Sequence, residues 1–290
     1  MSEFRTDDWL ANLVETVKAL ASGEREPAAP RHAATVVLLR DGGTGPEVYM
    51  LRRMASMAFA AGAFVFPGGS VDVRDEDFPD AMWVGPAPYE WAATLAASDD
   101  RIARALVCAA VRETFEESGV LLAGAHANEV VADTSGDDWE TDRLALIDRS
   151  LSLAEMLTRR GLLLRADLLH AWAHWITPEI EPRRFDTRFF VAELPSGQRT
   201  RDVGGEADHV TWIRPADAIA ANDRGEITML PPTIATLTDL AALSSTSDVV
   251  AAAREREVVT VLPKVVLGDN DQVRFLLPHD EGYDTAGARP

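Results

Sequence analysis

The stretch RETFEESGV, residues 112–120, gathers three carboxylates in nine residues of an otherwise apolar segment. Alanine and long-chain residues dominate 101–118 and a glycine follows, which predicts a helix that ends at this point. Side chains three and four positions apart share one face of a helix, so Glu113 should lie beside Glu116 and Glu117. The sequence therefore predicts a helix with three acidic groups on one face.

Two interpretations of this acidic face compete. The simpler one is a solvated surface, on which Arg112 and Glu116 form an i, i+4 pair worth about 0.2 to 0.5 kcal/mol. However, the cluster closes against a glycine and follows the turn FPGG at 66–69. Such an arrangement suits hard oxygen ligands for Mg²⁺ or Mn²⁺. We therefore favour a metal site over a solvated face.

Composition limits the classes of function. The formal net charge of −19 over 290 residues argues against broad electrostatic capture of DNA or RNA. No apolar stretch reaches the roughly 18 to 20 residues of a membrane span, and the first residues are acidic rather than basic and then apolar. We therefore expect no membrane span, no secretory signal and a cytoplasmic protein. The single cysteine, Cys108, is expected to pack in the core.

The rest of the chain alternates helical and strand patterns. Residues 6–22 have helical spacing, and 34–41 and 47–53 are typical of two strands joined by a glycine-rich turn. Residues 229–257 contain two helical patterns after a Pro-Pro break. The apolar runs in 258–284 predict a terminal hairpin around GDND.

The acidic stretch carries a family resemblance. Residues 112–120 match the REUxEExGU half of the Nudix hydrolase signature, GX5EX7REUXEEXGU, and Phe66-Pro67-Gly68-Gly69 resembles its glycine turn. The segments 48–72 and 175–195 are similar to the peroxisomal coenzyme A diphosphatase branch, which has a long insertion within the signature. The similarity runs from about Ala33 to Thr236 and leaves the N-terminal helix uncovered.

The resemblance implies an α+β fold. We expect the Nudix α/β/α sandwich, a mixed sheet between helices, with added N- and C-terminal elements. Residues 1–30 are assigned to an N-terminal helix and linker, and 31–236 to the Nudix domain, with an insertion at about 73–100. Residues 237–290 are assigned to C-terminal helices and a hairpin extension.

The resemblance also implies a chemistry. Divalent metals stabilise the charge of a diphosphate under hydrolysis and lower the pKa of a bound water. We assign Glu113, Glu116 and Glu117 as ligands of Mg²⁺ or Mn²⁺, and by resemblance the backbone carbonyl of Gly68 as a further ligand. Arg112 is expected to orient the glutamates, and a plain surface ion pair is its alternative role.

One position departs from the signature. The first glutamate should stand eight residues before Arg112, where the chain has Arg104. Either the insertion has moved this role to Asp72, Asp99 or Asp100, or the role is dispensable.

The general base is expected from a later loop. Glu206 lies in a glycine-rich approach that could bring a carboxylate near the metal face. Asp208 competes with it and His209 is a weaker candidate. Each of them alone is more often a solvated loop residue.

Arginines are the candidate phosphate contacts in so acidic a chain. Arg52 and Arg53 follow an apolar strand, and Arg183, Arg184 and Arg188 gather around a second expected strand. For any single arginine, ordinary salt bridging is the alternative.

Two histidines have the spacing of a possible metal site. His170 and His174 are spaced i, i+4 and could bind zinc, but no HExxH glutamate or cysteine accompanies them. A structural or surface role is therefore favoured. Trp172 and Trp175 are expected in the core.

We expect metal-dependent hydrolysis of a nucleoside diphosphate linked to another moiety. Coenzyme A or an acyl-CoA is the first choice by resemblance, and ADP-ribose, dinucleotides or nucleoside triphosphates are the alternative. A Nudix module that binds a nucleotide without cleaving it is an alternative of another class, against which the crowded glutamates speak and for which Arg104 speaks. Because Nudix proteins with extra terminal elements often pair, a homodimer is a further expectation.

Overall fold

The computed structural model describes residues 6–54, 60–201, 207–268 and 272–284. The chain forms two compact units. The smaller comprises Met1–His32, His174–Thr187 and Val259–Pro290, and the larger comprises Ala33–Ala173 and Arg188–Val258. The assignment of 31–236 to the Nudix domain stays a prediction, while these compact units divide the chain differently.

The larger unit is built on a sheet whose strands run in the order β10-β2-β1-β9-β8, with short strands β3 and β4 attached to β2 and β1. The bounds are β1 Arg31–Gly42, β2 Gly45–Arg53, β3 Phe64–Val65, β4 Gly68–Ser70, β8 His170–Ile176, β9 Phe185–Glu193 and β10 Ala207–Ile213. Strands β1 and β2 are antiparallel, with Gly42 opposite Gly45. The predicted hairpin is thereby confirmed.

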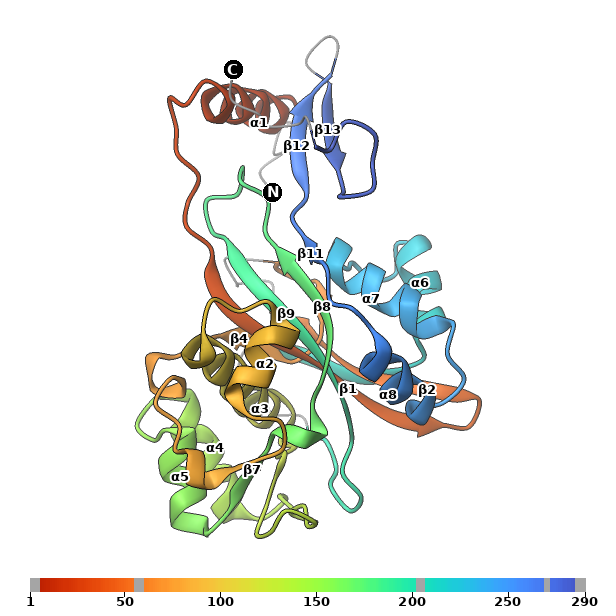
Figure 1. The fold of residues 1–290 in the computed structure, drawn as a ribbon. Helices are drawn as coiled ribbons and strands as arrows, with labels where there is room; N and C mark the ends of the chain where they lie inside the picture. The colour runs from red at the N-terminus through yellow and green to blue at the C-terminus, as the bar shows by residue number, and fades with distance from the viewer. Residues whose placement is uncertain (1–5, 55–59, 202–206, 269–271, 285–290) are drawn as a thin grey trace. The chain divides into compact units, whose positions relative to one another are not determined.

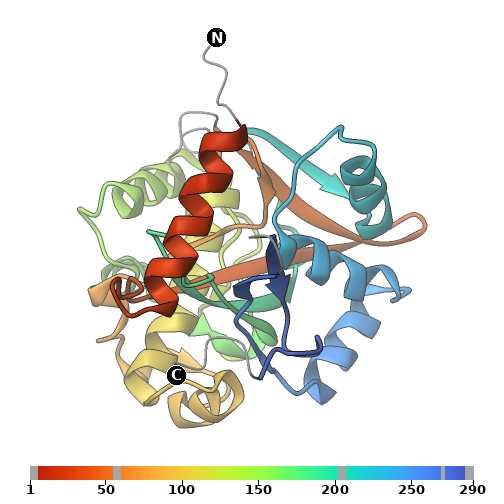
Figure 2. The same ribbon diagram turned by 90° about the horizontal axis from the view of Figure 1, so that it is seen from above.

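Helices flank this sheet on two sides, as the expected sandwich requires. In Figures 1 and 2, α2 to α5 lie to one side of the sheet and α6 to α8 to the other. The bounds are α2 Pro88–Leu95, α3 Asp100–Ser118, α4 Asp137–Ile147, α5 Leu153–Arg160, α6 Pro215–Asp223, α7 Pro231–Ala241 and α8 Thr246–Glu255. The helix predicted over 101–118 and the two patterns in 229–257 are confirmed.

The core of the larger unit lies between α3 and the sheet. Leu106 and Phe115 of α3 are completely buried in one cluster with Leu38 of β1 and Phe190 of β9. Burial of each such side chain stabilises the fold by about 1.5 to 3 kcal/mol. Cys108 is buried in the same cluster, and burial raises the pKa of its thiol well above the ordinary value. Its predicted packing role is confirmed.

The segment that precedes α3 is an excursion with little regular structure. It contains two 3₁₀ turns and a short strand before α2, and this strand joins a separate three-stranded sheet in the order β5-β7-β6. The bounds are η1 Val73–Asp75, η2 Asp80–Met82, β5 Trp83–Val84, β6 Ala123–Gly124, β7 Leu163–Arg165 and η3 Ala166–Leu168.

The smaller unit contains the predicted N-terminal helix and terminal hairpin. Its elements are α1 Thr6–Ala21, β11 Thr260–Val261, β12 Lys264–Leu267 and β13 Val273–Leu276. Strands β12 and β13 pair antiparallel, and β11 runs parallel to the end of β8.

His174 contacts side chains of β9 and β11 in the smaller unit. Its Nε2 lies 2.5 Å from Asp186 Oδ1, and its Nδ1 lies 2.7 Å from the hydroxyl of Thr260. Both ring nitrogens therefore have partners within the unit, which agrees with the structural role that the sequence favours.

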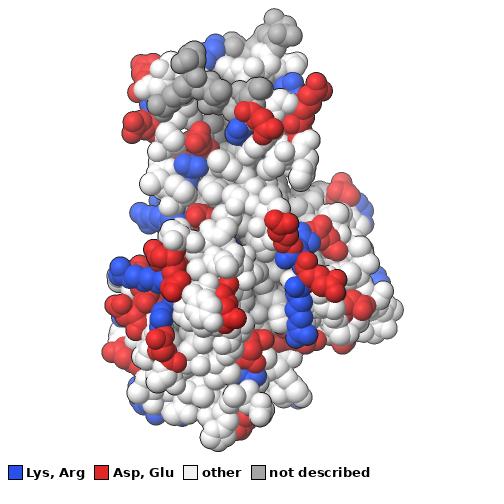
Figure 3. All heavy atoms as spheres, in the orientation of Figure 1, with Lys and Arg blue, Asp and Glu red and all other residues white. Residues whose placement is uncertain are grey.

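The charges visible on one face are mixed. In Figure 3, basic side chains alternate with acidic ones over the described residues. Within the described ranges, no helix is long and apolar enough to cross a membrane.

Candidate active site

Helix α3 presents the acidic stretch as the sequence predicts. The amide of Gly119 donates to the carbonyl of Phe115, and Gly119 adopts φ +74°, a left-handed conformation that favours glycine. The helix therefore continues through Glu117 and stops directly after it. The side chains of Glu113 and Glu116 are each only 12% exposed, so the solvated-face interpretation is wrong.

Arg112 lies at the centre of the acidic groups. Its Nη1 donates to Glu113 at 2.6 Å and to Glu116 at 3.1 Å, and its Nη2 donates to the carbonyl of Ser70 at 3.0 Å. Its Nε and Nη2 both contact the carboxylate of Asp75, at 2.9 to 3.3 Å. Only 8% of the Arg112 side chain is exposed. Its guanidinium is therefore a buried group that orients the glutamates, and the alternative of a surface ion pair does not apply.

Asp75 corrects the expectation for the missing signature acid. Counted forward from Gly69, the spacing GX5E falls on Asp75, and the long insertion follows this residue rather than preceding it. Asp75 is 3% exposed and forms the buried ion pair with Arg112. The sequence contained this signal, but counting backward from Arg112 concealed it.

The three acids that the sequence offered for this role lie at the starts of η1 and α3. Asp72 forms an ion pair with Arg74 and caps η1. Asp99 caps α3 by accepting from the amide of Ile102, and Asp100 begins that helix. The expectation that one of the three replaces the signature acid is therefore wrong.

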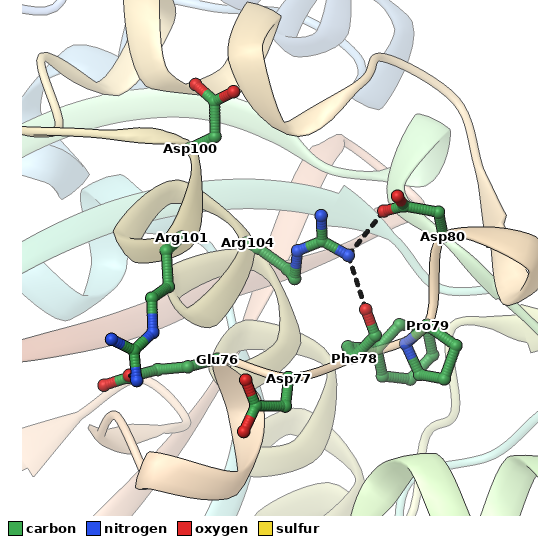
Figure 4. A pocket seen from close by; sticks show the side chains of 8 residues that line it. All are labelled: Glu76, Asp77, Phe78, Pro79, Asp80, Asp100, Arg101 and Arg104. Carbon is green, nitrogen blue, oxygen red and sulfur yellow. Dashed lines mark hydrogen bonds and ion pairs between the residues drawn. The ribbon is translucent and has the colours of Figure 1, made fainter.

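Arg104 serves the inserted segment instead. Its Nη1 donates to the carbonyl of Phe78 and pairs with Asp80, each at 2.5 Å, across an open hollow (Figure 4). At 1.5 Å per residue, Arg104 lies about 12 Å along the helix from Arg112. Arg104 therefore lies away from the place of the signature acid. Its presence does not favour a non-catalytic module.

The glycine turn packs directly against the acidic face. The amide of Gly68 donates to Glu117 Oε2 at 2.9 Å. A Cβ on Gly69 would lie 2.6 Å from the carboxyl carbon of Glu113, and one on Gly68 would lie 2.5 Å from the carbonyl oxygen of Ala34. At Gly68 the backbone of β1 leaves no room for a Cβ, while at Gly69 a Cβ would displace the Glu113 carboxylate. The role of the Gly68 carbonyl as a metal ligand stays a prediction.

Burial changes the protonation of the acidic groups. Burial raises the pKa of Glu113 to about 7, against the opposing effect of Arg112 and with a contribution from Glu116. Burial likewise raises the pKa of Glu116. Because a divalent cation binds carboxylates in their ionised form, it would compete here with a proton.

The oxygens present fit a hard divalent cation. Glu113, Glu116 and Glu117 come from adjacent turns of one helix and supply the carboxylate oxygens that a hard divalent cation prefers, and Gly69, which has no side chain, packs against the Glu113 carboxylate. Within the described residues, no three acidic, histidine or cysteine side chains already converge as a metal site. In this arrangement the Nη1 of Arg112 lies between two of the carboxylates.

The candidate general bases differ in how they are placed. Glu206 lies outside the described residues. Asp208 is paired with Arg52 at 2.6 Å on neighbouring strands β10 and β2, and this bond lowers the pKa of Asp208. The ring of His209 meets Phe64 edge-on, at 5.9 Å between centroids.

Arg184 and Arg188, two of the second group of candidate phosphate contacts, each donate to backbone carbonyls. Arg184 is buried and donates to the carbonyls of Thr177 and Ala28, and it belongs to the smaller unit together with the exposed Arg183. Arg188 belongs to the larger unit and donates to the carbonyls at the end of α2. Substrate binding by Arg52, Arg53, Arg183 and Arg184 stays a prediction.

This fold and site define a class of protein. The family model of the NUDT19 Nudix domain matches residues 96–240, which is half of the chain. The chain belongs to the Nudix hydrolase family, whose members use divalent metal ions and act on small nucleotide compounds. The resemblance drawn from residues 112–120 is confirmed.

Two curated relatives are similar to this chain. The putative nudix hydrolase 7 of Caenorhabditis elegans is 30% identical over 210 residues, which cover 72% of this chain and 60% of the relative. The acyl-coenzyme A diphosphatase NUDT19 of Homo sapiens is 28% identical over 273 residues, which cover 82% of this chain and 72% of the relative. The chain thus spans between about three fifths and three quarters of these relatives.

A solved structure shows the same fold. The crystal structure of a Nudix hydrolase from Alicyclobacillus acidocaldarius matches with a TM-score of 0.68 and 29% identity. The match covers 80% of this chain and 99% of that one. The expected Nudix fold is confirmed.

Proposed function

We propose that this chain is a metal-dependent diphosphatase that cleaves coenzyme A or an acyl-CoA. The observation that carries the proposal is the buried Arg112, which holds Glu113 and Glu116 on one helical face against the glycine turn. The choice of substrate is supported by relatives whose name is acyl-coenzyme A diphosphatase.

Each residue of the site has a role in this proposal. A divalent cation, Mg²⁺ or Mn²⁺, held by Glu113, Glu116 and Glu117 would neutralise diphosphate charge and make a bound water acidic. Arg112 fixes the direction of two of these carboxylates, and the amide of Gly68 fixes Glu117. Asp75 in turn holds Arg112 in place.

A carboxylate from the loop before β10 would accept the proton of the attacking water. Glu206 is our choice, because the carboxylate of Asp208 is already paired with Arg52. A Glu206→Gln variant should lower kcat and should flatten the rise of kcat with pH. The same change at Asp208 should leave both unaffected.

A substrate panel tests the proposal. Coenzyme A, an acyl-CoA, ADP-ribose, NADH, a diadenosine polyphosphate and a nucleoside triphosphate are each incubated with Mg²⁺ or Mn²⁺, and the products are identified by mass spectrometry. We expect the highest kcat/KM for the CoA compounds, with release of 3',5'-ADP and a phosphopantetheine product. Faster cleavage of another substrate would contradict the CoA assignment. Binding without turnover, unchanged in Glu116→Gln, would instead indicate a regulatory module.

The cytoplasmic location and the homodimer also remain our proposals. Fluorescence microscopy of a tagged protein tests the location. Sedimentation equilibrium tests the dimer, which predicts a mass near twice the 31.5 kDa of one chain.

A further inference from the structure

The C-terminal turn of α3 is held by groups from distant parts of the chain. The last four carbonyls of a helix lack partners within the helix. Here the carbonyl of Ser118 accepts from the amide of Arg201 at 3.0 Å, and that of Gly119 accepts from the hydroxyl of Thr134 at 2.6 Å. The hydroxyl of Tyr49 lies 3.5 Å from the carbonyl of Glu117. The carbonyl of Glu116 also accepts from outside the helix.

Arg143 of α4 supplies that donor. Its Nη1 donates to the carbonyl of Glu116 at 2.7 Å, across 27 residues of sequence. Its Nε and Nη2 make a two-pronged contact with Glu140, at 2.9 and 2.7 Å. Only 2% of Arg143 is exposed, so the side chain has little room to move.

Glu140 links Arg143 to a second arginine. Its Oε2 also accepts from Arg201 Nη1 at 2.9 Å, while Arg201 donates through Nη2 to the carbonyl of Thr134. The hydrogen bond from Arg143 lowers the pKa of Glu140, so this carboxylate stays ionised between the two cations. Positive charge at the C-terminus of a helix is favourable because the helix dipole is negative there.

We infer that Arg143 is a positioning residue for metal binding and catalysis, acting through the backbone of Glu116. This inference rests on the proposed function, since Glu116 and Glu117 lie in the turn that Arg143 holds. A helix end without such a donor frays, and the two carboxylates would then spread over more positions. Loss of groups that orient metal ligands typically costs about 10- to 100-fold in metal affinity or activity.

The test compares Mn²⁺ binding in matched variants of the full chain. Arg143→Met removes the donor but keeps much of the apolar volume, and Arg143→Lys keeps a charge that can reach the carbonyl. Arg159→Met is the control, because Arg159 of α5 pairs with Asp142 of α4, the helix that also carries Arg143. Electron paramagnetic resonance of free Mn²⁺ gives the dissociation constant, and steady-state kinetics give kcat and KM.

We expect Arg143→Met to raise the Mn²⁺ dissociation constant by about 10-fold or more and to lower kcat similarly, with KM for coenzyme A nearly unchanged. Arg143→Lys should recover most of the affinity, and Arg159→Met should match the wild type. An unchanged Mn²⁺ dissociation constant in folded Arg143→Met would overturn the inference.

A second variant decides the question if Arg143→Met does not fold. Glu140→Gln loosens Arg143 but leaves the guanidinium and its burial in place. It should raise the Mn²⁺ dissociation constant by about threefold or more, on the scale of lost ligand orientation. No change there would also overturn the inference. Failure of the wild type to bind Mn²⁺ or cleave any substrate would instead contradict the proposed function itself.

Discussion

The two ends of α3 are held in different ways. At the N-terminus, the exposed Asp99 accepts from the amide of Ile102, three residues away, and the cap needs nothing else. At the C-terminus, the carbonyls accept from Thr134, Arg143 and Arg201, all far along the chain. The terminal carbonyls at the acidic end thus accept from distant parts of the chain, while the N-cap at the other end comes from the adjoining sequence.

This difference has a physical meaning. A local cap costs little to form but leaves the end of a helix free to move with its loop. Side chains that must meet one metal ion need their backbone fixed by surrounding structure. We therefore expect changes near the C-terminal half of α3 to affect binding and catalysis, and changes at its N-terminus to affect stability alone.

The largest effect is expected at Asp75. Replacing Asp75 with Asn removes the most buried of the three carboxylates that pair with Arg112, and removing one partner of a buried pair is strongly destabilising, by about 3 kcal/mol. Urea unfolding measures the change. Asp72→Asn, which affects a less buried pair in the same loop, should cost far less. Equal losses in both variants would show that Arg112 does not depend on Asp75.

A slightly smaller effect is expected at Glu116, and in activity rather than stability. Glu116→Gln removes a charged oxygen from the proposed metal site, so kcat should fall by about 100-fold, or about 2.7 kcal/mol. The free energy of unfolding should fall less than in Asp75→Asn, because Arg112 keeps its closer contacts with Asp75 and Glu113. The exposed Glu226→Gln is the control. Full activity of Glu116→Gln would remove this residue from the site.

Gly69→Ala should have an intermediate effect. Its Cβ would come within 2.6 Å of the Glu113 carboxyl group, whereas a Cβ on Gly43 of the hairpin turn meets nothing within 4 Å. The added methyl group would displace the Glu113 carboxylate, and because disturbed ligand orientation typically costs about 10- to 100-fold in metal affinity, Mn²⁺ affinity should fall by about tenfold. Calorimetric titration measures the affinity in both variants. Equal affinities would mean that the glycine turn does not confine Glu113.

The smallest effect is expected at the other end of the helix. Asp99→Ala removes the N-cap and should lower the free energy of unfolding by about 1 kcal/mol. Its kcat and Mn²⁺ affinity should equal those of the wild type, because the acidic groups lie several turns away. Thermal unfolding with parallel kinetics measures both. A loss of metal affinity in Asp99→Ala would contradict the expectation that the N-terminal end of α3 affects stability alone.

The sequence predicts the local features of α3 but not its contacts with distant residues. Helix α3, its glycine end and the shared face of its glutamates depend on contacts within one or two turns, and spacing alone predicts them. Asp75 was within reach by counting from Gly69. Its contact with Arg112, across 37 residues, needed the fold.

The remaining site residues depend on contacts that spacing does not encode. Arg184 and Arg188 have the side-chain type of phosphate contacts, yet their guanidinium groups donate to backbone carbonyls. The role of Arg143 had no local signal at all, since its target is a backbone carbonyl 27 residues away. Side-chain type indicated which residues are able to bind phosphate or metal. Only the tertiary structure determined which partner each side chain has.

The central claim is that Glu113, Glu116 and Glu117 together bind a divalent cation. Crystals of the wild type soaked in MnCl₂ and measured for anomalous scattering test it directly. We predict an anomalous peak within ligand distance, about 2.0 to 2.6 Å, of carboxylate oxygens from these three residues. Crystals at millimolar Mn²⁺ with no peak there, or with a peak only at other acidic groups, would contradict it.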